Sequence, residues 1–172
     1  ELKLSAGRSN EQDLARIVAA AEQLIGDAQL WPLVVQSLHQ QRLCPAFDCI
    51  RYATTFNAAL LASLRYQTLL HPFILVRPKR LQQRLHIDWL PVSGLPDKHN
   101  KTFRDACDKL MLALVIHAAR VCQVNLSDWR IGVHDPKSLP VNWHTWISTI
   151  DSRPIPCLSF PLHQLPMQNP TA

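Results

Sequence analysis

The sequence predicts an α+β fold in which several N-terminal helices and one long helix pack on a small, mostly antiparallel sheet. Two observations carry this prediction. Apolar residues recur at helical spacing through the first 72 residues and again in an amphipathic segment of 22 residues at 102–123. The other segments after residue 73 are short, partly alternating and bounded by prolines, which is typical of strands near the edge of a sheet.

The composition is that of one globular domain. Of 172 residues, 47% are apolar and 18% are charged, which is enough apolar surface for a core. We therefore expect a single regulatory domain over residues 1–172, with flexible ends at 1–9 and 167–172. The net charge of +5 is mildly basic. A solvated basic face explains it better than nucleic-acid binding does, since charge balance alone specifies no partner.

The cysteine pattern predicts reduced thiols and a cytoplasmic location. There are five cysteines, an odd number, and none forms a CxxC pair. No apolar run approaches the ~20 residues that cross a bilayer, so no membrane contact is expected. His39, Cys44 and Cys49 lack the tight pairs of a zinc site, and we expect neither a metal nor a cofactor. Because residue 1 is Glu, we expect the chain to have been trimmed from a longer protein.

The first half predicts three helices. One spans residues 10–26, between Asn10 as the N-cap and Gly26 as the stop. A second is expected to start near Pro32 and to end near residue 41, followed by a loop or turn at 44–48. The third starts at residue 54 or 55 and ends at Pro72, and its Ala- and Leu-rich circumference predicts a central, buried helix.

The second half predicts strands around one long helix. Strands are expected at 73–79 and 84–92, a polar loop at 93–101, and the long helix at 102–123, capped by Thr102. Three further strands are expected at 129–134, 143–150 and 157–162. In the strand at 84–92, Leu85, Ile87 and Trp89 alternate with polar residues, which indicates one wet face.

Three blocks stand in an order that is known from one family. The first is YATTFNAALLASLRYQTLLHP, the second is the long helix followed by WRIGVHDPKSLP, and the third is WISTIDSRPIPCLSFPLHQLPMQNP. Together they resemble the N-terminal effector-binding domain of AraC/XylS-type bacterial transcription regulators, in the branch of the ornithine- and arginine-utilisation regulators. GDAQL at residue 26 also fits this branch, whereas its usual glycines between residues 43 and 52 are absent. The matching residues are Thr55, Ala59, Leu60, Arg65, Tyr66, Val133, His134, Pro136, Leu158, Phe160, Pro161, Leu165 and Pro166.

The resemblance implies a sensing function. It implies that a small effector binds between the helices and the sheet and that the regulator is a homodimer. It further implies that DNA is contacted only by a separate C-terminal helix-turn-helix domain, which this chain does not include. Two alternatives stay open: a dimerisation or partner-docking domain without an effector, and, more weakly, an enzyme. We expect no enzyme, because no GxSxG, HExxH or P-loop motif is present.

Four residues are candidates for the effector site: Arg65, Tyr66, His117 and Trp129. Arg65 and Tyr66 point about 100° apart on one helix, so only one can face inward. Arg65 and His117 could hold a small carboxylate, whereas structural roles in ion pairing and in the core are the alternative. Trp129 could form part of an apolar pocket wall or simply pack on the sheet. The His134-Asp135 pair is expected to be structural.

Overall fold

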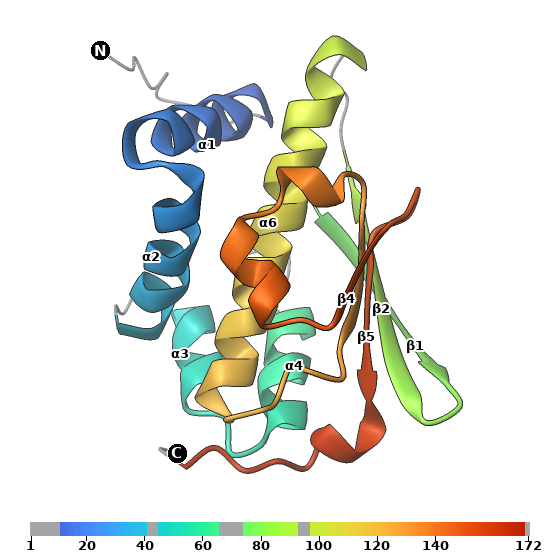
Figure 1. The fold of residues 1–172 in the computed structure, drawn as a ribbon. Helices are drawn as coiled ribbons and strands as arrows, with labels where there is room; N and C mark the ends of the chain where they lie inside the picture. The colour runs from blue at the N-terminus through green and yellow to red at the C-terminus, as the bar shows by residue number, and fades with distance from the viewer. Residues whose placement is uncertain (1–10, 41–44, 66–73, 93–96, 171–172) are drawn as a thin grey trace.

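The computed structural model describes residues 11–40, 45–65, 74–92 and 97–170. Its sheet has the strand order β1-β2-β5-β3-β4, and every neighbouring pair is antiparallel except β3 and β4, which are parallel (Figure 1). The strands are β1 (Ile74–Leu81), β2 (Arg84–Pro91), β3 (Arg130–Val133), β4 (Thr149–Ser152) and β5 (Cys157–Pro161). Together with one long helix and the N-terminal helices, this sheet confirms the predicted α+β fold.

The first two helices meet at a glycine. Helix α1 (Glu11–Ile25) ends at Gly26, whose φ of +86° lies in the left-handed region that favours glycine. Helix α2 (Asp27–Gln40) begins directly afterwards, so the prediction of a start near Pro32 is wrong. Pro32 has no N–H to bond the Ala28 carbonyl one turn earlier. The side chain of Asn142 donates to that carbonyl instead, at 3.3 Å. This bond from a distant segment replaces the helical hydrogen bond that Pro32 cannot make.

Two short helices follow. Helix α3 (Pro45–Arg51) replaces the loop that was expected at 44–48, with proline at its first position, where the missing N–H costs no hydrogen bond. Helix α4 (Phe56–Arg65) begins where predicted, because the Thr55 hydroxyl accepts a bond from the Ala58 amide at 3.1 Å. Its expected continuation to Pro72 lies outside the described residues. Helix α4 is also not central, since Leu61 on its outer side is exposed.

The central helix is α6 (Asp97–Val121). Helices α1 and α2 pack on one side of it and the sheet lies on the other, so that it is enclosed between two layers (Figure 1). Its predicted apolar stripe, from Phe103 to Val121, is buried apart from the half-buried Leu110. The helix starts before Thr102, inside the predicted loop, and the i,i+4 ion pair between Lys101 and Asp105 stabilises this first, solvated part.

The aromatic residues build the core rather than a pocket wall. Trp129 stacks on Phe160 with ring centroids 5.1 Å apart, and Trp31 meets Trp143 edge-on at 5.9 Å. Trp143 lies in the 3-10 helix η2 (Val141–Thr145), and β4 begins only at Thr149, so the strand predicted at 143–150 is wrong over residues 143–148. The other 3-10 helices are η1 (Pro136–Ser138) and η3 (Leu162–Gln164).

The last described residues are held against the helices. The Asn169 side chain donates to the backbone carbonyls of Arg51 and Ala53, at 2.8 and 2.9 Å. Residues 167–170, expected as part of a flexible end, are therefore packed. No helix of the described part of the chain is both long and apolar enough to cross a membrane.

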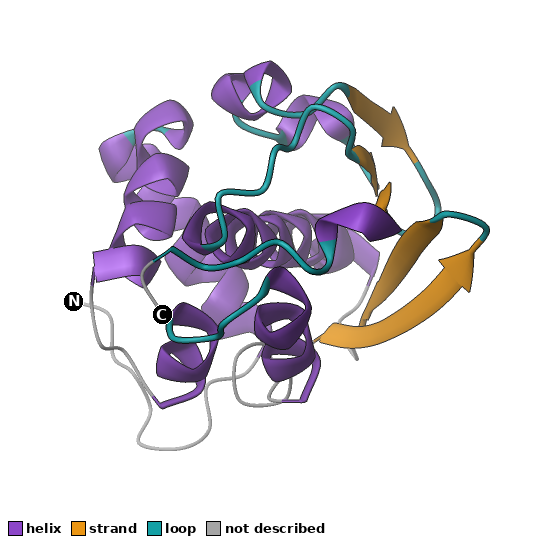
Figure 2. Ribbon diagram, turned by 90° about the horizontal axis from the view of Figure 1, so that it is seen from below, coloured by secondary structure: helices purple, strands orange, loops and turns teal. Residues whose placement is uncertain are grey.

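The sheet has two different faces. Ile87 and Trp89 of β2 are buried toward the helices, whereas His86 and Asp88, which alternate with them, point to the other face. Both views show all helices of the described chain on the first side or at the ends of the sheet (Figures 1 and 2). The second face, called the outer face below, is therefore open to solvent.

Candidate functional site

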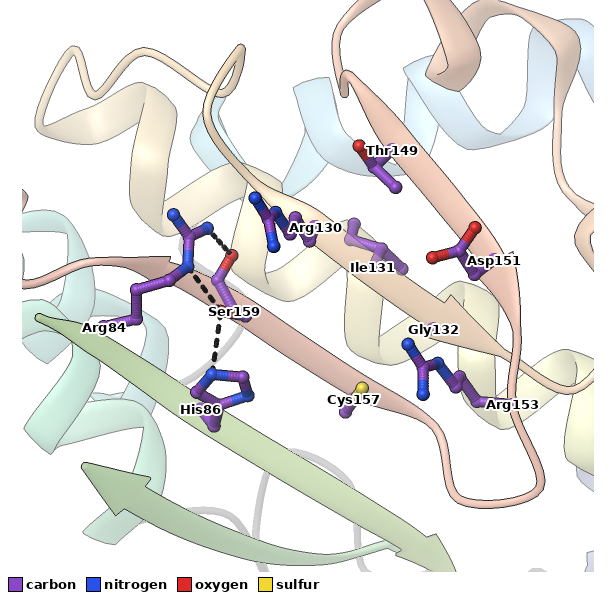
Figure 3. A pocket seen from close by; sticks show the side chains of 10 residues that line it. All are labelled: Arg84, His86, Arg130, Ile131, Gly132, Thr149, Asp151, Arg153, Cys157 and Ser159. Atoms are coloured by element: carbon purple, nitrogen blue, oxygen red, sulfur yellow. Dashed lines mark hydrogen bonds between the residues drawn. The ribbon is translucent and has the colours of Figure 1, made fainter. Parts of the chain in front are cut away.

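A cleft of about 290 Å³ lies on the outer face of the sheet, and we call it the sheet cleft (Figure 3). Its side chains come from four strands and from the turn between β4 and β5. The order of the strands explains this gathering, because β5 lies between β2 and β3. The lining residues are Arg84, His86, Arg130, Ile131, Gly132, Thr149, Asp151, Arg153, Cys157 and Ser159.

Arg84 is held in place by three hydrogen bonds. Its Nε donates to Ser159 Oγ at 2.8 Å, and its Nη2 donates to the carbonyls of Ser159 at 2.9 Å and Asp128 at 2.7 Å. These bonds fix the guanidinium group at one end of the cleft. Desolvation by burial and, second, the charge of Arg130 lower the pKa of Arg84. The charge of Asp128 opposes this shift with a smaller effect, so two arginines and one carboxylate act on each other at this end of the cleft.

His86 lies next to this arginine pair. Its Nε2 is 3.1 Å from Ser159 Oγ, the oxygen to which Arg84 also donates (Figure 3). Burial and, next in size, the charge of Arg84 lower the pKa of His86 below its ordinary value. The ring is therefore mostly neutral at pH 7. An anion in the cleft would oppose the effect of Arg84 and favour the protonated ring.

The other end of the cleft depends on Gly132. A Cβ at this position would lie 2.3 Å from Cγ of Arg153 and 3.1 Å from Sγ of Cys157. The Arg153 side chain therefore lies directly over the glycine, and any larger residue would displace it. Within the described part of the chain, the guanidinium groups of Arg130 and Arg153 have no hydrogen bond or ion pair with another residue.

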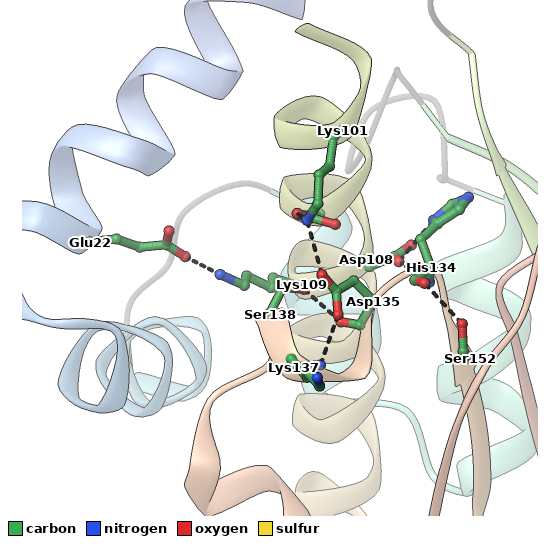
Figure 4. Close-up of polar contacts among 10 residues, drawn as sticks. Glu22, Lys101, Asp108, Lys109, His134, Asp135, Lys137, Ser138 and Ser152 are labelled. Carbon is green, nitrogen blue, oxygen red and sulfur yellow. Dashed lines mark hydrogen bonds and ion pairs between the residues drawn. The ribbon is translucent and has the colours of Figure 1, made fainter. Parts of the chain in front are cut away.

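A second cleft, of about 510 Å³, lies beside the first and shares Arg153 with it. Here Lys101 is already paired, since it bridges Asp105 at 2.8 Å and Asp135 at 3.0 Å (Figure 4). The hydrogen bond from Lys101 and the amide of Lys137 lower the pKa of Asp135. Lys101, Arg104 and Arg153 line this cleft together with two carboxylates, so its excess of positive charge is smaller than that of the sheet cleft.

Between the second cleft and the core lies the carboxylate of Asp108. Its Oδ2 accepts the backbone amide of His134 and lies 3.0 Å from the ring Nδ1 of the same residue. Its Oδ1 accepts the indole N–H of Trp89 at 2.8 Å. His134 therefore connects the end of β3 to helix α6, which agrees with the structural role expected for it.

The structure does not bring the four predicted site residues together. Arg65 is exposed at the end of α4, so it is not an inward-facing residue, and Tyr66 lies outside the described residues. His117 is fully buried in α6, and Trp129 is a core residue whose Nε1 donates to Gln164 at 2.7 Å. None of the four lines either cleft described above. Their ligand-binding role stays a prediction.

One pattern in the sequence points to the sheet cleft. Arg84 and His86 alternate with apolar residues in β2, and Arg130 precedes the buried Ile131 in β3. Both patterns mark outward-facing side chains. That these strands become near neighbours through β5 is a property of the topology, which periodicity does not reveal.

The comparisons with known proteins concern the fold. The sequence matches no protein-family model and no curated protein. Among solved structures, the transcriptional regulator CdpR from Pseudomonas aeruginosa is similar, with a TM-score of 0.57 and 11% sequence identity. The match covers 98% of this chain and 60% of CdpR. The chain thus has the fold of a large part of a transcriptional regulator, and it spans about 60% of that regulator's length.

Proposed function

We propose that this chain is the effector-binding and dimerisation domain of an AraC-type transcription regulator. The observation that carries the proposal is the similarity between nearly the whole chain and 60% of CdpR, a transcriptional regulator. A sensing domain that occupies only part of a regulator would give this kind of partial match. In the proposed protein, DNA is contacted only by a separate C-terminal helix-turn-helix domain.

The positions that carry the family resemblance support the proposal. Thr55 caps α4, His134 bonds to Asp108, and Leu158 and Phe160 lie in the core. These contacts determine the positions of helices α4 and α6 relative to the sheet. A family that shares these residues therefore shares the contacts that define this fold.

The proposed mechanism is a population shift between two conformations. A small effector, for which we propose a carboxylate or a similar anion, changes the regulator only if it binds one conformation better than the other. A tenfold preference shifts that equilibrium by about 1.4 kcal/mol. The sheet cleft joins strands β2, β3, β4 and β5 and the turn after β4, so a ligand there would restrain these segments relative to one another.

Binding fits the cleft better than catalysis does. The contact between Ser159 and His86 is one that a serine nucleophile needs, but the serine is only 4% exposed. Among the described residues, no carboxylate accepts a hydrogen bond from the other nitrogen of His86. Burial raises the pKa of the Cys157 thiol, which makes it a poor nucleophile at pH 7.

A reporter assay tests the regulatory function. The chain is fused to a helix-turn-helix domain that represses a promoter only as a dimer, and cells are grown on different small organic acids. We expect repression to require the fused chain and to change with one class of acid. Sedimentation should give twice the monomer mass of 19.6 kDa. A monomeric chain that does not repress contradicts the proposal.

An effector-free docking domain is the second candidate. The observation that favours it is the exposure of large apolar side chains on the first two helices, namely Ile17, Leu24, Ile25 and Leu33. In the reporter assay this candidate gives repression that no small molecule changes. The two functions therefore predict different results in the same experiment.

A further inference from the structure

We infer that the sheet cleft is a binding site for a small dianion, either a dicarboxylate or a phosphate group, held by Arg84, Arg130 and Arg153. This inference goes beyond the proposed function and does not depend on it. A protein that regulates no gene could still have this site. Its basis is the charge, the fixed geometry and the size of the cleft.

The charge of the cleft matches a dianion. Three arginines line it, and Asp151 is the one carboxylate among its ten lining residues. With His86 neutral, three positive charges and one negative charge leave a net charge of +2. In the described chain, Arg130 and Arg153 have no carboxylate partner, in contrast to Lys101 of the second cleft. A ligand with two negative charges would neutralise this excess.

The geometry is partly preorganised. Arg84 is fixed by its bonds to Ser159 and Asp128, so it loses little side-chain freedom when a ligand binds. Arg130 lies beside it and still has all of its donors available (Figure 3). Planar guanidinium groups bind carboxylate and phosphate oxygens with two parallel hydrogen bonds. Arg130 can form such a pair, and the fixed Arg84 still offers its Nη1 donors, because its Nε and Nη2 hydrogens are already donated. Together they form a suitable anion clamp.

The third guanidinium group and the volume of the cleft also fit a small dianion. Gly132 leaves room for the Arg153 side chain, which brings a third guanidinium group to the end opposite Arg84. The volume of about 290 Å³ is at the lower limit of small-molecule sites, which begin near 300 Å³. The cleft therefore suits a ligand of the size of succinate or inorganic phosphate rather than a nucleotide.

Calorimetric titration of the purified chain tests the site. The probes are succinate, inorganic phosphate and sulfate, with acetate as a monoanion of the same chemistry. We expect one saturable site for a dianion and weaker binding of acetate. The key variant is Arg130→Gln, which removes a cation that bonds to no described residue and so should not disturb folding. It should weaken binding by about tenfold or more.

Arg80→Gln is the matched control. Arg80 is exposed on β1 and pairs with Leu85 rather than with a lining residue of the cleft, so its removal changes the net charge equally. Its affinity should stay within about twofold of the wild type, and circular dichroism should show both variants folded. A preference for succinate identifies a dicarboxylate site, and a preference for phosphate or sulfate identifies a phosphate site.

Two results would overturn the inference. One is the absence of saturable binding of any dianion to the wild-type chain. The other is equal weakening by Arg80→Gln and Arg130→Gln, which would show that only the net charge attracts the anion. Dianion binding without a response in the reporter assay would instead keep the site and reject its regulatory use.

Discussion

The indole N–H of Trp89 donates to the carboxylate of Asp108 at 2.8 Å, and this bond fastens strand β2 to helix α6. Both residues are buried, with Trp89 in β2 and Asp108 near the middle of the helix. The second carboxylate oxygen bonds to the amide of His134 at the end of β3. One side chain thus sets the position of the helix against two strands that are not neighbours in the sheet.

Replacement of Asp108 should therefore be costly. Asp108→Ala leaves the Trp89 indole and the His134 amide without their acceptor, at about 1–3 kcal/mol for each buried donor. We expect the free energy of unfolding to fall by about 3 kcal/mol, measured by urea denaturation. Asp105→Ala, on the same helix, removes only an ion pair with the exposed Lys101 and should cost about 1 kcal/mol or less. Equal losses in the two variants would argue against the role given to Asp108.

The buried stripe of α6 gives a second stability prediction. Leu114 is 4% exposed in the middle of this helix, so Leu114→Ala should lower the free energy of unfolding by about 2–5 kcal/mol. Leu61 on α4 is 56% exposed, and Leu61→Ala should cost less than about 0.5 kcal/mol. Urea denaturation of both variants measures the difference. A loss below 0.5 kcal/mol at Leu114 would mean that the buried face of α6 is misassigned.

The sequence predicted those elements whose signals are local. Gly26 ends α1, Thr55 starts α4, and alternation identifies β2. The wrong predictions concern segments whose structure depends on contacts with residues far away in the sequence. Pro32 should start a helix by local preference, yet it lies inside α2. The side chain of Asn142 donates a hydrogen bond to the carbonyl of Ala28, which Pro32 cannot bond. Local preference is overridden in this way wherever tertiary contacts satisfy the backbone.

The candidate site was harder to predict than the fold. Arg84 and Arg130 are 46 positions apart, and they meet because β5, the last strand of the chain, pairs with both β2 and β3. Alternation in β2 shows that Arg84 faces outward, but not which strand lies beside it. The family pattern predicts a ligand-binding role for Arg65, whereas in the structure this residue is exposed at a helix end.

The position of Arg65 leads to a third prediction, for a thermal-shift experiment. A bound dianion should raise the melting temperature, with a stabilisation of about 2.7 kcal/mol at a hundredfold excess over Kd. Because Arg65 is exposed and does not line the sheet cleft, Arg65→Ala should retain this shift, whereas Arg130→Gln should lose most of it. Loss of the shift in Arg65→Ala would place the ligand near α4 and restore the original assignment.

DNA binding by the isolated chain should be weak and unspecific. The outer face carries arginines and a lysine, including Arg77, Lys79, Arg84, Arg130 and Arg153, which can attract phosphates without reading bases. We expect an affinity that falls steeply with salt and does not differ between sequences. Fluorescence anisotropy at two salt concentrations, with several promoter fragments, measures both properties. Tight binding to one fragment at physiological salt would contradict a purely regulatory role for residues 1–172.

The last prediction concerns the effect of pH on anion binding. Burial and, second, the charge of Arg84 hold the pKa of His86 below its ordinary value. Lys79 on β1 and Arg130 on β3 also lower this pKa, whereas Asp88 on β2 raises it. Ser159 and Cys157 face the ring from β5 as uncharged groups, since burial raises the pKa of that thiol. A dianion beside the ring would raise the pKa of His86, so binding should take up a proton.

The sign of the pH dependence follows from this shift. Between the pKa of His86 in the free protein and its higher value in the complex, affinity should increase as the pH falls. Below the lower value, the free ring is already protonated and affinity should level off. Sulfate is the suitable probe, because it remains a dianion from about pH 8 to about pH 5, the range in which histidine titrates. His86→Gln should still bind sulfate, with an affinity that no longer changes over this range. A wild-type affinity that is independent of pH, or one that decreases toward low pH, would show that His86 does not face the bound anion.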